Sequence, residues 1–268
     1  GPAGAIMATL VVSAVSAATG DQFLTWGWRI PFLLSAALIA VGMVIRLKVA
    51  ETPMFNKLAE ASEKRKMPLL DVLRNHPRAV VLALLATVSF YCCQGLLTVW
   101  GVSIAVSNGV ERSGVLNWKA AGAVLTLVVT FWAARMSDRV GRRRMLVFAG
   151  IIGIVLAYPL MALLNNGTMW GFAVAIAVGN GLVQGLLYGP IGAFVAEQFP
   201  THVRYTGASL AYQGASVVGA GFTPMIASGL VIAAGGGFGL VAGFWMVVMA
   251  IGLVAVLLTR ESSKTSLS

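Results

Sequence analysis

The 268-residue chain is 58% hydrophobic and only 10% charged, with a formal net charge of +10 and a mean hydropathy of +0.87. A soluble domain carries roughly 25% charged residues, so this chain cannot cover a water-facing surface and its outer surface must meet lipid. The positive charge does not indicate nucleic-acid binding, because the basic residues are confined to a few short segments between long uncharged runs.

The apolar runs predict eight transmembrane helices. Crossing the hydrocarbon core takes about 20 mostly apolar residues as a helix, and membrane strands would instead give short alternating segments. The uncharged runs 145–196 and 205–259 are each too long for one span, and NNGT at 165–168 and GGG at 235–237 divide them. In chain order, the expected helices cover residues 3–19, 31–48, 79–105, 117–134, 145–164, 169–196, 207–232 and 238–259.

The distribution of basic residues predicts the orientation of these helices. Sixteen of the 19 Lys and Arg residues fall in the segments 46–78, 135–144, 197–206 and 260–268. The other three are Arg29, Arg112 and Lys119. Cytoplasmic loops carry the excess of Lys and Arg. We therefore expect these four segments, and both ends of the chain, on the cytoplasmic side of the plasma (inner) membrane.

The sequence offers no pattern for enzymatic or metal chemistry. Cys92 and Cys93 are adjacent within an apolar run, and no CxxC or Cys/His spacing occurs. No expected span carries Asp or Glu near its centre, where a buried proton relay would need one. We expect neither a cofactor nor a metal, and we do not expect an enzyme.

Neutral polar residues do follow single helix faces within the spans. One face of the third expected helix carries Thr87, Tyr91, Gln94 and Thr98, the sixth carries three polar residues spaced by four, and the seventh carries a third patch. A Gln or Asn facing lipid is costly, so these side chains must face protein or water. Hydrogen bonds between helices would satisfy them, as would an aqueous cavity. As a group we predict that they line a cavity: Tyr91, Gln94, Asn180, Gln184, Tyr188, Tyr212 and Gln213.

Two further patterns concern packing. Gly181, Gly185 and Gly189 form a small-residue stripe beside the polar face of the sixth helix, and such stripes let helices approach closely. Trp100 and Trp118 are predicted to be anchors at the membrane interface.

The segment ARMSDRVGRRRM, residues 134–145, holds five arginines within ten residues. Gly141 permits a tight turn between two antiparallel helices, and Asp138 is placed among cations at a helix end. A topology signal accounts for the arginines alone. The position of Asp138 favours a second function, in which its carboxylate pairs with arginines and latches helices together.

This segment resembles the signature loop of the major facilitator superfamily, G-x-x-x-D-R-x-G-R-R. The match runs through Asp138, Arg139, Gly141, Arg142 and Arg143, and Ala134 stands where glycine is usual. The stretches GWRIPF at 27–32, ETPMF at 51–55 and FPTHVRYTGAS at 199–209 resemble the metabolite:proton symporter family of that superfamily, with His202 where arginine is expected. That family carries organic acids and zwitterions, such as shikimate, citrate, proline and betaine.

The resemblance implies an all-α integral membrane protein that corresponds to helices 5 to 12 of a twelve-helix transporter. Residues 1–48 would be the last two helices of the N-terminal half, 49–78 the central cytoplasmic linker, 79–259 the six-helix C-terminal half and 260–268 a cytoplasmic tail. The four preceding helices would hold a first copy of the signature loop and a proton-coupling carboxylate.

The implied function is secondary active transport, a proton-coupled symport of a small organic acid or zwitterionic metabolite by alternating access. The signature loop would be a cytoplasmic gate. The partners would be the lipid bilayer, the metabolite, protons and the missing N-terminal helices, with no nucleic acid. The alternatives are a transport-inactive truncated fragment and a channel-like or receptor-like helical membrane protein.

Overall fold

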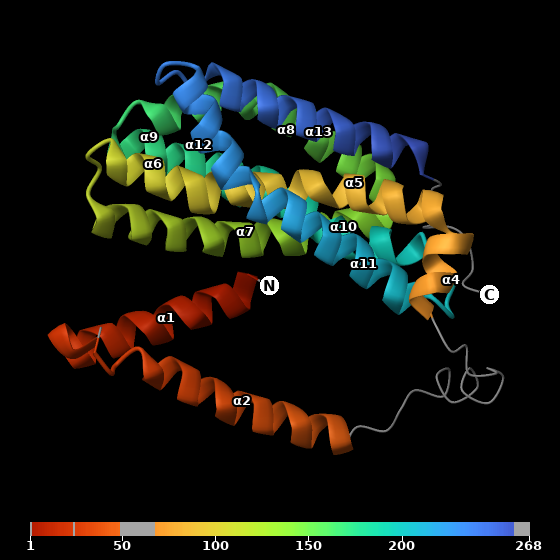
Figure 1. The fold of residues 1–268 in the computed structure, drawn as a ribbon, viewed down its shortest axis with the longest axis horizontal. Helices are drawn as coiled ribbons and strands as arrows, with labels where there is room; N and C mark the ends of the chain where they lie inside the picture. Colours follow the sequence, from red (N-terminus) through yellow and green to blue (C-terminus); the bar gives the residue numbers. More distant parts are fainter. Residues whose placement is uncertain (1, 24, 49–67, 260–268) are drawn as a thin grey trace. The chain divides into compact units, whose positions relative to one another are not determined.

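The computed structural model describes residues 2–23, 25–48 and 68–259, and the described residues are helical apart from short turns. The expected all-α class is therefore confirmed. The predicted tail 260–268 lies outside the described residues, as does most of the predicted linker 49–78. The chain divides into two units, residues 1–66 and 67–268, whose described helices Figure 1 shows in red to red-orange and in orange to blue, respectively.

The first unit is a pair of helices, α1 (Pro2–Thr19) and α2 (Arg29–Lys48), with the short 3-10 helix η1 (Gly20–Phe23) after α1. Its turn is held by local hydrogen bonds, since the Trp26 indole donates to Gln22 Oε1 at 2.9 Å and Arg29 donates to the carbonyl of Thr25 at 2.7 Å. The Arg29 guanidinium also lies 4.5 Å from the centre of the Trp28 ring. The Arg29 side chain therefore interacts with residues of its own turn.

The second unit is a bundle of long helices with one short helix, α4 (Pro68–Asn75), at one end. Three of its long helices are each interrupted by a π-helical segment, and these segments are labelled η2, η3 and η4. In chain order the unit contains α5 (Pro77–Gln94), η2 (Gly95–Trp100), α6 (Gly101–Ser107), α7 (Arg112–Val140), α8 (Arg142–Asn165), α9 (Met169–Ala175), η3 (Ile176–Gln184), α10 (Gly185–Glu197), α11 (Arg204–Ser216), η4 (Val217–Gly221), α12 (Thr223–Ala233) and α13 (Gly239–Leu258).

Seven of the described helices are long and apolar enough to cross a membrane. They are Arg29–Lys48, Pro77–Ser107, Arg112–Val140, Arg142–Asn165, Met169–Glu197, Arg204–Ala233 and Gly239–Leu258. Six of the seven contain one of the predicted spans completely, and the predicted span 238–259 exceeds the seventh, Gly239–Leu258, by one residue at each end. The first predicted span, 3–19, is helical as α1 but is not among the seven, so the count of eight spans stays a prediction.

The prediction that residues 135–144 form a loop is wrong. Helix α7 continues to Val140 and α8 begins at Arg142, so the reversal is made by Gly141 alone, at a φ of 109°. Glycine adopts this left-handed conformation without the steric cost that a Cβ brings. Because no further turn residues are needed, Asp138 and Arg139 stand on the last turn of α7 and Arg142 and Arg143 on the first turn of α8.

The position of Trp100 also differs from the prediction. Its side chain is only 4% exposed and belongs to the core, so it is no interface anchor. Trp118 is 37% exposed and lies beside Trp170, with 6.1 Å between the ring centres. A tryptophan near a helix end can point into the protein core or toward the membrane interface, and the sequence pattern does not distinguish these two positions.

The glycine stripe of the sixth predicted span packs closely on another helix, as expected, and the structure shows that this helix is α7. A Cβ on Gly181 would lie 2.5 Å from Leu125, and one on Gly185 would lie 2.8 Å from Val129. At Gly189 the neighbours are the Ala134 backbone nitrogen at 2.7 Å and Ala133 Cβ at 2.8 Å. Backbone cannot rotate away as a side chain can, so this contact fixes the distance between α10 and α7.

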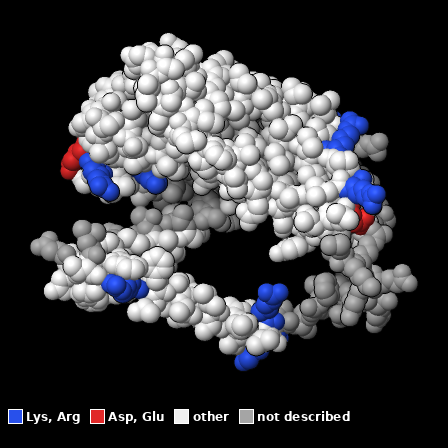
Figure 2. All heavy atoms as spheres, viewed as in Figure 1, with Lys and Arg blue, Asp and Glu red and all other residues white. Residues whose placement is uncertain are grey.

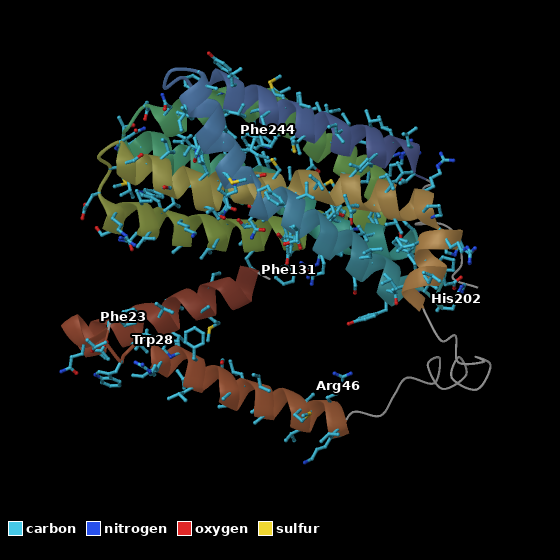
Figure 3. The ribbon with its side chains drawn as sticks, in the orientation of Figure 1. Phe23, Trp28, Arg46, Phe131, His202 and Phe244 are labelled. Atoms are coloured by element: carbon cyan, nitrogen blue, oxygen red, sulfur yellow. The ribbon has the colours of Figure 1, made fainter. Side chains whose placement is uncertain are left out.

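The charged side chains of the second unit gather at its two ends, and Figure 2 shows an uncharged surface between them. One end carries α4, the α7–α8 turn and the start of α11, and Figure 3 labels His202 there. The imidazole rings of His76 and His202 lie 6.5 Å apart, which places the α4–α5 junction against the segment before α11. We call this the arginine end of the unit.

We predict that Gly189→Ala destabilises the bundle, by about 1–3 kcal/mol, because overpacking against backbone forces the two helices apart. Gly243→Ala in α13 is the matched control, since a Cβ there would meet nothing within 4 Å. That control should be neutral or stabilising by up to about 1 kcal/mol, because alanine favours a helix more than glycine does. Thermal unfolding of the detergent-solubilised protein measures both. Equal unfolding temperatures would show that the α7–α10 contact tolerates a methyl group.

Candidate functional site

Three of the predicted cavity residues come together from three helices. Tyr91 on α5, Tyr188 on α10 and Tyr212 on α11 lie near one another in the bundle. The Tyr188 ring also lies 5.0 Å from the Phe90 ring. Residues from three helices, 24 to 121 positions apart in the sequence, thus form one aromatic cluster, which we call the tyrosine cluster.

A small residue makes room for this cluster. Gly192 follows Tyr188 by one turn of α10, and a Cβ there would lie 3.5 Å from the Tyr212 hydroxyl. The phenol groups are neutral donors and acceptors, and their ring faces attract cations. The cluster can therefore hydrogen bond an uncharged or anionic group and can also accommodate a positive one.

Gln184 is the second component of the site. It ends the π-helical segment η3, one turn before Tyr188, and is 5% exposed. Among the described residues its side-chain oxygen, Oε1, is buried without a hydrogen-bond partner. An unpaired buried amide oxygen costs about 1–3 kcal/mol. Native structures keep few such groups, and the others among the described residues are on Thr130, Arg142 and Trp245.

Asn180 is also buried, but it faces another helix. Its backbone carbonyl accepts a hydrogen bond from the Thr126 hydroxyl on α7 at 2.9 Å. Its side-chain nitrogen lies 3.5 Å from where a Cβ on Gly122 of α7 would stand. These contacts are those of a residue at a helix–helix interface, which was the alternative interpretation of the polar faces.

Gln94 and Gln213 are not drawn into the tyrosine cluster. Gln94 is partly buried at the end of α5, and Gln213 is exposed on α11. Among the described residues, neither side chain hydrogen bonds to the three tyrosines. Thr87 and Thr98, which share the predicted face of α5, donate to the carbonyls of Ala83 and Gln94 in their own helix at 2.7 and 2.8 Å.

Irregular helix geometry marks the same level of the bundle. The segment η2 begins directly after Gln94, η3 ends at Gln184 and η4 begins directly after Ser216. Such π-helical turns appear frequently at functional sites, because the widened turn redirects side chains and frees backbone groups. The hydropathy pattern carries no sign of them, so the sequence could not predict them.

The described part of the site holds no ionised group and no metal cluster. Within the described spans of the second unit, acidic side chains occur only near the ends, at Asp138 and Glu197. No group of three or more His, Cys, Asp or Glu side chains is placed to hold a metal among the described residues. Cys92 and Cys93 are free and buried.

The second candidate site is the arginine turn between α7 and α8. Arg142 donates to Glu197 Oε1 at 2.5 Å and to Asp138 Oδ1 at 3.4 Å. Its side chain is 20% exposed and that of Glu197 17%, whereas that of Asp138 is 67% exposed. Arg143 donates to the backbone carbonyl of Leu257 at 2.5 Å. The turn is therefore tied to the ends of α10 and α13.

Glu197 is the residue that the sequence analysis missed. It is the one acidic residue between Asp138 and Glu261, and it ends α10 two residues before the FPTHVRYTGAS stretch begins at Phe199. Its isolation in the sequence was a usable signal. The expectation of Asp138 as the lone carboxylate among the arginines is therefore incomplete, because the closer and more buried partner of Arg142 is Glu197. Arg139 is exposed on the last turn of α7.

Comparisons with known proteins agree with this architecture. The family model described as sugar (and other) transporter matches residues 54–266, more than half of the chain. The chain belongs to this family of the major facilitator superfamily. No solved structure matches.

Several curated relatives are transport proteins. The inner membrane metabolite transport protein YhjE of Escherichia coli K12 is 36% identical over 259 residues, 93% of this chain and 57% of its own length. The shikimate transporter of the same strain is 30% identical over 97% of this chain and 60% of its own length. The citrate-proton symporter of Klebsiella pneumoniae is 28% identical over 98% of this chain and 57% of its own length.

The chain thus spans a little over half the length of these relatives. They are transporters and not enzymes, as the sequence predicted. With seven apolar helices of spanning length, the chain is a multi-pass membrane protein of a bacterial inner-membrane family.

We predict that Glu197→Gln destabilises the second unit more than Asp138→Asn. Removing the charge of the mostly buried partner of Arg142 should cost about 1.5–3 kcal/mol, the range for charged hydrogen bonds. The Asp138 pair is exposed and screened, so its loss should cost about 0.5 kcal/mol or less. Thermal unfolding in detergent, with Glu111→Gln at the opposite end as the control, measures the difference. The reverse order would mean that Asp138 holds the turn.

Proposed function

We propose that this chain is part of a secondary active transporter that moves a small organic acid or a zwitterionic metabolite together with protons. The observation that carries the proposal is the buried, unpaired amide oxygen of Gln184, one helical turn before Tyr188 of the tyrosine cluster. This arrangement has hydrogen-bonding capacity left over, which a substrate with a donor group can use. One relative is named a citrate-proton symporter, and this supports protons as the coupling ion.

The residues that would bind substrate from this half are Gln184, Tyr91, Tyr188 and Tyr212. Gln184 Oε1 would accept from a hydroxyl or ammonium group of the substrate. The phenol hydroxyls would donate to its carboxylate. Gln94, Asn180 and Gln213 stay predicted cavity residues at the edge of this group. The carboxylate that couples protons would belong to the four helices that the resemblance assigns to the complete transporter.

The tyrosine cluster generates a direct test. In the complete transporter, Gln184→Ala should weaken substrate binding, raising KM by about tenfold, because one hydrogen bond to the substrate is lost from a water-excluded site. Tyr188→Phe should act in the same direction. Thr87→Val is the control, since its hydroxyl bonds within its own helix. The measurement is concentrative uptake of radiolabelled organic acids and betaines driven by a proton gradient.

The outcome of that assay also separates the alternatives. A channel equilibrates a solute and cannot accumulate it, so uptake that never exceeds the external concentration would favour a channel. A receptor would bind without any flux. Unchanged KM in Gln184→Ala, with normal uptake, would place the binding site elsewhere.

The orientation of the chain follows from its basic residues, and we predict a cytoplasmic arginine end. A reporter inserted after Arg144 should be cytoplasmic, and one inserted after Asn166 should be external, because Lys and Arg are retained on the cytoplasmic side. Alkaline phosphatase and fluorescent-protein fusions report the two sides. A reporter fused after Ser268 should agree with Arg144, and opposite locations for these two would overturn the number of spans between them.

The arginine turn would act as a cytoplasmic latch between the two halves of the transporter, closed when the cavity faces outward. Within this half Arg142 is held by Glu197, which fixes the turn as a rigid base. Asp138 is largely exposed and its bond to Arg142 is long, so its carboxylate is available to a partner in the other half. A charged hydrogen bond of about 1.5–3 kcal/mol shifts a two-state equilibrium by roughly ten- to a hundredfold.

We therefore predict that Asp138→Asn in the complete transporter leaves membrane insertion and substrate binding intact but slows turnover. It should also make cysteines placed at 180, 184 and 188 more accessible to a cytoplasmic thiol reagent, because the latch opens. Arg144→Gln is the control, since only the topology signal would use that arginine. Transport equal to wild type at equal expression would reduce the turn to a topology signal.

A further inference from the structure

An apolar groove on the outside of the second unit is unrelated to the tyrosine cluster. It runs between α5 and α13 and has a volume of about 350 Å³. We call it the α5–α13 groove, and it is lined by Leu82, Leu85, Val247, Ala250, Ile251, Val254, Ala255 and Leu258. Four of the α13 side chains are 44–58% exposed, so the groove opens outward from the helix pair.

The shape of the groove arises from small residues on α13. Gly252 lies against Ser89, where a Cβ would stand 2.7 Å from the serine side chain, so the two helices touch beside the groove. Ala250 and Ala255 leave the space between the larger side chains that border it. The result is a hollow with apolar walls rather than an open gap between helices.

The length of the groove matches one leaflet of a bilayer. Its α13 residues extend from Val247 to Leu258, which is roughly 16 Å of helix at 1.5 Å per residue. The hydrocarbon core is about 30 Å thick, so one leaflet is about half of that. A lipid tail that begins at the arginine end would therefore fill the groove along its whole length.

Two arginines stand where that tail would meet its headgroup. Arg78 precedes Leu82 by one turn and Leu85 by two on α5, which puts all three on one helix face. Arg78 is exposed and makes no ion pair within the described part of the chain. Arg143 donates to the carbonyl of Leu257, the neighbour of the groove residue Leu258. Only one of its five N–H donors is used in that bond.

We propose that the α5–α13 groove binds an anionic phospholipid, with one acyl chain in the groove and the phosphate held by Arg78 and Arg143. Guanidinium groups bind phosphate oxygens through charge-assisted hydrogen bonds, and the apolar walls exclude a polar occupant. The lipid joins the N-terminal end of α5 to the C-terminal end of α13. It thus fastens α5 and α13 together at the arginine end.

The test counts the lipids that stay with the protein. The full 268-residue chain is purified from bilayers of equal phosphatidylglycerol and phosphatidylcholine, and native mass spectrometry measures the lipids retained. We expect phosphatidylglycerol to be retained about tenfold more than phosphatidylcholine. The double variant Arg78→Gln, Arg143→Gln should lose that preference. Ala250→Phe, which fills the groove, should lower retention of both lipids by severalfold.

Two variants serve as controls. Val155→Phe adds the same bulk at a site on α8 that is 67% exposed and far from the groove residues in sequence, and Arg112→Gln removes a charge at the opposite end. Both should retain phosphatidylglycerol as wild type does. If Ala250→Phe does not fold, the arginine variant still decides, because its changes lie at the surface.

Several results would overturn the proposal. Equal retention of the two phospholipids by the wild type would remove the headgroup site. Unchanged retention in Ala250→Phe and in the arginine variant would place the lipid elsewhere. A dimer that Ala250→Phe dissolves, without retained lipid, would assign the groove to a second copy of the chain. Displacement of the lipid by inorganic phosphate at millimolar concentration would reduce the site to an anion site.

Discussion

Hydrocarbon offers no hydrogen bonds, and this constraint decides where each polar group of the spans can stand. The backbone is satisfied within helices, and most hydroxyl groups follow the same solution. Thr87, Thr98 and Ser228 donate to carbonyls four residues earlier, at 2.7–2.9 Å. Such side chains need no partner from another helix. Against that background, the unpaired oxygen of Gln184 is an exception that the bundle does not resolve internally.

The same constraint places charged residues at the two ends of the bundle. The turn between α7 and α8 can then be very short. Asp138, Arg139, Arg142 and Arg143 occupy helix ends rather than a loop, because Gly141 alone reverses the chain. Long arginine side chains can then reach neighbouring helix ends. Arg142 reaches Glu197 on α10, and Arg143 reaches the last turn of α13. One short turn thereby connects four helices of the bundle at the arginine end.

The features that follow from hydropathy and charge could be predicted from the sequence. The positions of the long helices, the glycine contacts of α10 and the basic end of the bundle all follow from the avoidance of charge and bulk in tightly packed spans. The expected span 117–134 stopped before the charged residue Arg135, and this placed its C-terminal end six residues too early. Charged residues can continue a helix beyond the hydrocarbon, so α7 extends from Arg112 to Val140.

Properties that depend on tertiary contact could not be predicted in this way. The burial of Trp100, the π-helical segments and the pairing of Arg142 with Glu197 all require knowledge of which helices are neighbours. Among the candidate cavity residues, periodicity placed Tyr91, Tyr188 and Tyr212 on the correct faces, and they do converge. It could not distinguish Gln184 from Asn180, which share one face of one helix. The difference lies in α7, whose Gly122 lets it approach Asn180 closely.

That difference has a physical consequence for the proposed binding site. A polar residue that is satisfied by its neighbours stabilises one arrangement of helices and resists change. A polar residue that is left unpaired raises the energy of the empty state, so a ligand that supplies the missing donor recovers about 1–3 kcal/mol. Asn180 lies at the contact of η3 with α7, whereas in the proposed site Gln184 would respond to substrate. In the proposed site, Asn180 would thus serve helix packing and Gln184 substrate recognition, although the two residues are only four positions apart on η3.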